Sequence, residues 1–165
     1  MPHGPRRERR VTVGPMIEVL RTDSHDPRFR ALVAELDADL WRRYGNLQAA
    51  YAPHNLIETL ATVIVALDGG RPVGCGCFKP FGAGTVELKR MYVAPDARGR
   101  GIAGQVVAAL EQWARELGFT AIALETGTKQ HEAIALYTKL GFAPIDRFGP
   151  YVDLPLSVCM RKSLT

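Results

Sequence analysis

The sequence predicts one α+β domain (mixed α/β), in which helices cover the faces of a mixed sheet. Its length of 165 residues, with 47% hydrophobic and 23% charged residues, suits a single globular core. Runs that alternate like strands are interleaved with runs that repeat apolar residues at helical spacing. A helical run over 101–117 joins strand-like runs over 85–93 and 120–125, and such a crossover joins two parallel strands in a right-handed connection.

The first half of the chain predicts a strand, a helix and an antiparallel meander. Asp26 before Pro27 is typical of a helix start, because the aspartate caps the first turn and proline fits the first helical position. Asp68-Gly69-Gly70 is typical of a hairpin turn between two β-branched apolar runs. The predicted elements are a strand over 16–22, a helix over 26–43, a connection with a short helix over 44–55, and strands over 61–67, 72–78 and 85–93.

The second half predicts alternating helices and strands. Ile102, Val106 and Leu110 begin the apolar stripe of the clearest helix, and Gly118 ends it because glycine readily adopts the left-handed conformation after a last turn. The predicted elements are a helix over 101–117, a strand over 120–125, a helix over 130–140, a loop over 148–151 and a last strand over 156–160.

The charge of the chain is concentrated at its start. Residues 1–10 supply +3 of the net +4, so the remainder lacks the basic face of a nucleic-acid-binding protein. We expect residues 1–14 to form a flexible basic tail and residues 15–165 to form the domain. No apolar run approaches the ~20 residues that span a membrane, and none follows the N-terminal arginines as in a secretory signal. A cytoplasmic location without a membrane partner is therefore expected.

Three cysteines, Cys75, Cys77 and Cys159, are too few for a disulfide scaffold. Cys75 and Cys77 lie two apart on a predicted strand, where they share a face and do not readily bridge. No Cys/His group has the spacing of zinc ligands. We expect buried thiols and no metal site.

A glycine- and arginine-rich turn over 93–104 separates the strand over 85–93 from the helix over 101–117. Glycines let a ligand approach the backbone, and the first N–H groups of a helix have no partner inside it. The helix dipole also favours an anion at that end. The turn therefore predicts a phosphate-binding site.

Gly99-Arg-Gly101-Ile-Ala-Gly104 also matches the dinucleotide fingerprint G-x-G-x-x-G, with Glu125 where a ribose-binding acid would lie. In that design the glycines follow directly after a strand that is buried on both faces. Here residues 94–98 intervene. Strict alternation along the strand would also put charges on both faces: Glu87, Lys89, Met91 and Val93 on one, and Val86, Leu88, Arg90 and Tyr92 on the other. A nicotinamide-dependent oxidoreductase remains the weaker alternative, and a Walker loop is excluded because no Lys-Ser/Thr follows the glycines.

The turn resembles the acyl-CoA pyrophosphate loop of the GNAT superfamily of N-acetyltransferases. The signature R/Q-x-x-G-x-G/A is matched by Arg98-Gly-Arg-Gly101-Ile-Ala103, after Val93-Ala-Pro95 and before the helical motif Ala133-Ile-Ala-Leu-Tyr137-Thr-Lys-Leu-Gly141-Phe142. The resemblance implies a mostly antiparallel sheet of six to seven strands flanked by about four helices. It also implies acetyl-CoA as co-substrate and transfer of the acetyl group to a primary amine by direct attack in a ternary complex. A non-catalytic acyl-CoA-binding regulatory domain is the other alternative.

The resemblance also implies roles for individual residues. The N–H groups from Gly99 to Gly104 would bind the pyrophosphate, with charge added by Arg98 and Arg100, and the Val93 main chain would contact the pantetheine arm. Gln130 stands where many family members have asparagine, and its amide can still donate and accept. The expected cofactor-binding residues are Met91, Tyr92, Val93, Arg98, Gly99, Arg100, Gly101, Ile102, Ala103, Gly104, Gln130, Ala133 and Tyr137.

Two catalytic roles follow from the same resemblance. Tyr137 would protonate the leaving thiolate, since the pKa of a phenol is close enough to that of a thiol for the two to share a proton. Glu87 would deprotonate the ammonium of the acceptor. Glu125 is the alternative base, and the thiol of Cys75 or Cys77 is a remote alternative. The acceptor is expected to be a small-molecule or peptide amine, near the aromatic residues Tyr44, Tyr51, Phe148 and Tyr151. An exposed meander edge and an exposed last strand would suit a homodimer.

Overall fold

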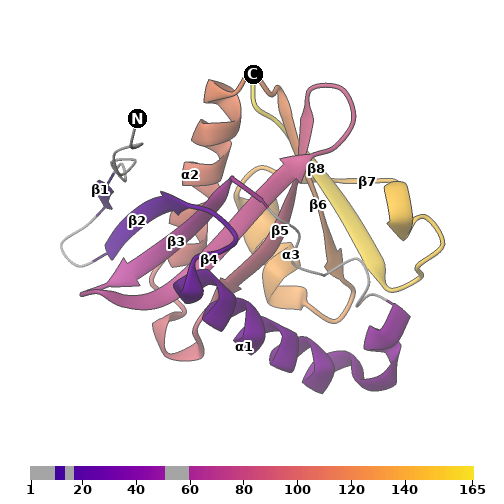
Figure 1. Cartoon of the computed structure of the whole chain (residues 1–165). Coiled ribbons are helices and arrows are strands. Elements are labelled where there is room, and N and C mark those ends of the chain that lie inside the picture. The colour runs from indigo at the N-terminus through magenta and orange to yellow at the C-terminus, as the bar shows by residue number, and fades with distance from the viewer. Residues whose placement is uncertain (1–9, 14–16, 51–59) are drawn as a thin grey trace.

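An eight-stranded mixed sheet forms the centre of the molecule (Figure 1). The computed structural model describes residues 10–13, 17–50 and 60–165. The sheet order is β1-β2-β3-β4-β5-β6-β8-β7, and β5 and β6 form its parallel pair. The strands are β1 (Arg10–Val13), β2 (Ile17–Thr22), β3 (Val63–Asp68), β4 (Arg71–Pro80), β5 (Thr85–Val93), β6 (Ala121–Gly127), β7 (Ala143–Ile145) and β8 (Ser157–Ser163).

Helices cover both faces of this sheet. On β3, Val63 and Val65 pack in the cluster formed with α1, whereas Ile64 and Ala66 pack in the cluster formed with α2, as expected for alternating side chains. The helices in the described residues are α1 (Pro27–Tyr44), α2 (Ile102–Glu116) and α3 (His131–Lys139), with short 3-10 helices η1 (Gly45–Ala50), η3 (Pro95–Ala97) and η4 (Gly149–Tyr151). None of these helices is both long and apolar enough to cross a membrane.

The predicted fold class is confirmed, and local signals account for the main elements. The Asp26 side chain accepts a hydrogen bond from the Arg28 N–H at 2.9 Å and caps α1, with Pro27 as the first helical residue. Thr85–Leu88 of β5 pair in parallel with Ala121–Leu124 of β6, as the crossover through α2 requires. The structure has three α-helices in its described residues rather than about four.

Two edge strands were not predicted. Residues 10–13, placed by the sequence analysis in a flexible tail, form β1 and pair antiparallel with β2; the other residues of that tail lie outside the described ones. Three exposed residues form β7, which covers β8, so the expectation of an exposed last strand is wrong. With four and three residues, both strands are too short to be identified from the periodicity of their apolar residues.

A bulge in β5 overturns the predicted division of its faces. Cys75 pairs with Tyr92 but Cys77 pairs with Lys89, so β5 contains one extra residue at this point. Arg90 has a φ of 57°, a left-handed conformation that costs an arginine about 1–2 kcal/mol. As a result Met91 joins Val86 and Leu88 on the α2 face, and Tyr92 turns to the α1 face.

The bulge also shapes the space between the two parallel strands. Their pairing ends at Leu88 and Leu124, although β5 continues to Val93 and β6 to Gly127. Beyond that point, residues of both strands line cavities instead of facing one another across ladder hydrogen bonds.

Candidate active site

The loop between β5 and α2 has a backbone suited to an anion. Gly99 and Gly101 have φ of 79° and 76°, and a Cβ on either would meet no atom within 4 Å, so both face open space. Gly101 is the N-cap of α2 and has no side chain with which to cap it. The first N–H groups of this 15-residue helix therefore point to a site that a phosphate could occupy.

A cavity of about 450 Å³ runs along this loop and along α3. Apart from Arg100, every residue expected to bind the cofactor lines it, including the β5 residue Val93 and the α3 residue Tyr137. We call this cavity the outer groove. Its apolar walls near Met91 and Leu136 and its glycine-lined end match the apolar arm and the charged end of an acyl-CoA molecule.

The two arginines of the loop have different surroundings. Arg98 lines the outer groove, and its Nε donates to the Val93 carbonyl at 3.0 Å while its guanidinium lies over the Tyr92 ring. Arg100 Nη1 instead lies 2.8 Å from Asp68 Oδ2 at the end of β3. This ion pair directs the Arg100 side chain to the neighbouring strand, so Arg100 does not line the outer groove.

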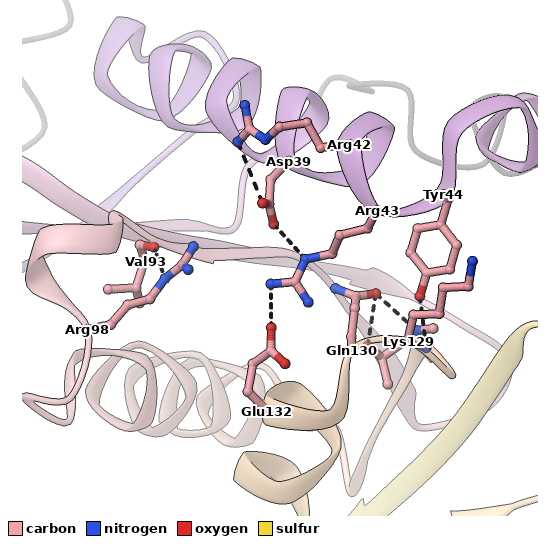
Figure 2. A network of polar contacts seen from close by, with 11 residues as sticks. Asp39, Arg42, Arg43, Tyr44, Val93, Arg98, Lys129, Gln130 and Glu132 are labelled. Carbon is pink, nitrogen blue, oxygen red and sulfur yellow. Dashed lines mark hydrogen bonds and ion pairs between the residues drawn. The ribbon is translucent and has the colours of Figure 1, made fainter.

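Residues of α1 and α3 that the sequence did not indicate also line the outer groove. Figure 2 shows Arg43 of α1 between Asp39 and Glu132, and this side chain pairs with both carboxylates. The Arg43 and Asp39 side chains share one face of α1 at i, i+4 spacing, which is the available sequence signal. That α1 faces α3 across the groove follows only from tertiary packing.

A second cavity of about 120 Å³ lies between α1 and the separated ends of β5 and β6. We call it the inner cavity. It adjoins the outer groove, because five residues line both spaces; these are Leu36, Met91, Gln130, Ala133 and Tyr137. Tyr44, predicted to lie near the acceptor, lines the inner cavity, and Tyr51 lies outside the described residues.

Tyr137 lies at the junction of the two cavities. Its side chain is buried, and its ring meets that of Phe142 edge-on with 5.6 Å between the centroids. Burial raises the pKa of Tyr137 above its usual value, so the hydroxyl keeps its proton at neutral pH. A phenol that lines both cavities can hydrogen-bond to a group in either space, and its raised pKa makes it a weaker acid than a free tyrosine.

Glu125, the alternative carboxylate of the sequence analysis, lines the inner cavity. Burial raises its pKa to about 7, helped by the negative charge of Glu87 and opposed by a hydrogen bond from Ser157 and by the charge of Lys89. Ser157 Oγ donates to Glu125 Oε1 at 3.0 Å. A carboxylate with this pKa can both accept and release a proton near neutral pH.

Glu87, the predicted base, is buried outside both cavities. The Tyr151 hydroxyl donates to Glu87 Oε2 at 2.7 Å, and Lys89 Nζ lies 3.9 Å from the same oxygen. Tyr151 and Phe148, proposed from the sequence to lie near the acceptor, pack against each other away from the cavity walls. The bulge explains the difference, since Glu87 precedes it in the paired part of β5, whereas Glu125 lies beyond that pairing.

The thiols are buried, as predicted, and do not line either cavity. Cys75 Sγ donates to the Arg90 carbonyl and Cys77 Sγ to the Lys89 carbonyl, so both thiols contact the bulge. Burial raises the pKa of the Cys75 thiol far above its usual value. Because the thiolate is the nucleophile, Cys75 is a poor candidate for covalent catalysis.

Gln130, at the start of α3, lines both cavities. Its Oε1 accepts a hydrogen bond from the Gly127 N–H at 3.0 Å, drawn with the neighbouring Lys129–Tyr44 contact in Figure 2. This bond uses the amide oxygen, so the amide nitrogen is the group available to donate towards a ligand.

Comparisons with known proteins agree with this geometry. A sequence profile of the acetyltransferase (GNAT) family matches residues 19–142. An IAA acetyltransferase of Azospirillum brasilense is 42% identical over 138 residues, 80% of this chain and 90% of that protein. The crystal structure of a candidate acyl-CoA N-acyltransferase from Klebsiella pneumoniae is 37% identical, with a TM-score of 0.74 over 91% of this chain and 99% of that one.

The fold is also shared with a more distant protein whose ligand is known. The PaiA N-acetyltransferase of Thermoplasma acidophilum, solved with coenzyme A, covers 90% of this chain and 99% of its own with a TM-score of 0.63 and 16% identity. The glycine-rich loop lies inside the matched family region and follows a bulged, charge-bearing strand, so the dinucleotide alternative loses its support. The chain belongs to the GNAT family of acetyltransferases.

Proposed function

We propose that this protein is an acetyl-CoA-dependent N-acetyltransferase that acts on a primary amine by direct attack in a ternary complex. The observation that carries this proposal is the meeting of the outer groove and the inner cavity at Tyr137, with Glu125 in the inner wall. One space suits an acyl-CoA and the other a small acceptor. The family and the names of the relatives support acyl transfer in general.

The residues of the outer groove would hold acetyl-CoA, which supplies an activated acetyl group as its thioester. The N–H groups from Gly99 to Gly104 face the pyrophosphate, and Arg98 adds positive charge. Val93 and Met91 line the groove between this loop and Tyr137, along the path of the pantetheine arm. The reacting carbon is thereby brought to the junction of the two cavities.

Glu125 and Tyr137 handle the two protons of the reaction. Glu125 takes a proton from the acceptor ammonium, which frees the nitrogen lone pair to form the bond to the acetyl carbon. Tyr137 donates its hydroxyl proton to the sulfur as the carbon–sulfur bond breaks, and the second proton that the nitrogen loses as the amide forms restores this hydroxyl. With a pKa of about 7, Glu125 is a proton acceptor matched to neutral pH. Glu87 does not contact the acceptor; its negative charge raises the pKa of Glu125.

Direct attack needs no covalent enzyme intermediate, and the surroundings of the thiols favour it. Cys75 is fully buried against the bulge, and burial raises its pKa. A buried thiol in its protonated form cannot accept the acetyl group at a useful rate.

The test is to measure acetyl-CoA binding by calorimetry and CoA release over a panel of primary amines. We expect binding together with amine-dependent release, and loss of release but not of binding in Tyr137→Phe. Binding without release for any amine would favour the non-catalytic acyl-CoA-binding domain. Binding of NADH in place of acetyl-CoA would refute the assignment of the groove.

A further inference from the structure

We propose that the acceptor is an amino acid with a small apolar side chain, and that Arg90 holds its carboxylate. This inference rests on the proposed function and names the substrate class of the same site. Three features of the inner cavity carry it: its size, the leucine side chains in its wall and an incompletely paired arginine in the same wall.

The inner cavity has room for a small apolar group. Its volume is about 120 Å³, close to the ~150 Å³ of an apolar protein cavity that accommodates benzene. Leucine side chains from α1, β5, β6 and the segment before β8 form most of its apolar wall: Leu36, Leu40, Leu88, Leu124 and Leu156. A branched alkyl or single-ring side chain would fill this space.

Arg90 lines the same cavity and is only 8% exposed. One of its terminal nitrogens, Nη2, pairs with Asp37 of α1, but the buried Nε has no hydrogen-bond partner among the described residues. A buried donor of a charged group without an acceptor is unfavourable, and native proteins rarely keep one without a reason. A carboxylate is the acceptor that matches a guanidinium best.

The backbone at Arg90 points to the same conclusion. Among the described residues, Arg90 is the one residue other than glycine that has a positive φ. It occupies the bulge at which β5 separates from β6. Strained backbone conformations persist where the surrounding structure holds them, and they cluster at ligand sites. At this position the strain brings an arginine into the wall of the cavity that also contains Glu125.

The charges in the wall suit a zwitterion. Glu125 is complementary to an ammonium group, and Arg90 and Lys89 are complementary to a carboxylate. A plain alkylamine would bring a positive charge into a cavity whose wall contains two cationic side chains. An amino acid brings an ammonium group for Glu125 and a carboxylate for the Arg90 guanidinium.

The test compares three acceptors with one side chain: L-leucine, L-leucinamide and 3-methylbutylamine, each with acetyl-CoA. We expect kcat/KM for L-leucine to exceed that for the amide and the amine by about tenfold or more. This is the factor that corresponds to the free energy of one charge-assisted hydrogen bond. The amide has the more easily deprotonated amine, so a preference for the acid would not reflect the supply of free amine. Arg90→Met should abolish this preference, so that the ratio of kcat/KM for L-leucine to that for 3-methylbutylamine falls to about one.

The ratio of kcat/KM between two acceptors is measured on one protein preparation, so partial misfolding of Arg90→Met does not affect it. Acetyl-CoA binding separately reports whether the outer groove is intact. Acetylation of the amine and the amide at a rate equal to or above that of L-leucine would overturn this inference alone. Retention of the preference in Arg90→Met would also overturn it. Absence of acetylation of every amine, with acetyl-CoA bound, would instead refute the proposed function and the inference with it.

Discussion

Replacing Glu125 by glutamine should change stability and activity with opposite dependence on pH. The pKa of this buried carboxyl is raised from 4.5 to about 7. The folded protein therefore holds the Glu125 proton more tightly than the unfolded chain does. The stability that this proton contributes is fully present below pH 4.5 and is lost as the pH rises through 7.

The size of the effect follows from the same two values. Each unit of pKa difference corresponds to about 1.36 kcal/mol, so a pKa raised from 4.5 to about 7 lowers the free energy of unfolding by about 3 kcal/mol between acid and weakly alkaline pH. Glutamine has a similar shape and does not ionise. Relative to the parent protein, Glu125→Gln should therefore gain about 3 kcal/mol in stability between pH 4.5 and pH 8.

The assay is urea unfolding followed by tryptophan fluorescence across this pH range, together with a pH profile of kcat/KM. The parent profile should fall on its acid side with an apparent pKa near 7. Glu125→Gln should lose about 10²–10⁴-fold in kcat/KM together with this acid limb. Ser157→Ala, which removes the hydrogen bond that lowers the pKa, should move the limb to higher pH, and Glu87→Gln should move it to lower pH.

Glu111→Gln provides the matched control. Glu111 is also a buried carboxylate, but Lys162 Nζ lies 3.0 Å from both of its oxygens and it is outside the two cavities. This variant should lose stability and keep the acid limb of the profile. A stability difference between Glu125→Gln and the parent that is constant with pH would refute the raised pKa. An unchanged acid limb in Glu125→Gln would refute its role as the base.

Three further predictions concern the junction and the loop. Tyr137→Phe should lower kcat by about 10²–10⁴-fold with little change in acetyl-CoA affinity. If kcat and acetyl-CoA affinity fell by comparable factors, the role of Tyr137 would be packing instead. Gly101→Ala and Gly118→Ala both place alanine at positive φ in open space, at opposite ends of α2, so each should lose about 1 kcal/mol in urea unfolding. Only Gly101→Ala should weaken acetyl-CoA binding, and equal effects of the two on binding would contradict the loop assignment. In calorimetry Arg98→Ala should weaken acetyl-CoA binding, whereas Arg100→Ala, which breaks an exposed ion pair worth about 0–1 kcal/mol, should leave it within about twofold; the reverse order would restore Arg100 to the cofactor site.

Much of the fold and of the outer groove could be predicted from local patterns. Asp26 and Pro27 begin α1 where the capping preference puts them, and Gly118 follows α2 with a φ of 89°. The loop glycines have the positive φ that their residue type permits, and Val93 and Tyr137 line the groove that the family resemblance implied. These features depend on a residue and its near neighbours in the chain, so the sequence records them directly.

The acceptor side could not be predicted in this way. The left-handed conformation of Arg90 breaks the alternation of β5, and nothing in the residue type indicates it because arginine rarely adopts that conformation. The bulge puts Glu125 rather than Glu87 in the cavity, and α1 packing brings Arg43 beside Glu132.

The sequence by itself determined the order of the main elements, the glycine-rich loop and the tyrosine of the neighbouring helix, because glycine geometry, caps and periodicity are local. The tertiary structure alone decided which carboxylate and which arginines line the two cavities. The position of a side chain across a sheet depends on a one-residue shift in pairing, and the energy of that shift is set by contacts with distant segments: the Cys75 and Cys77 thiols on the bulge carbonyls and Asp37 on Arg90.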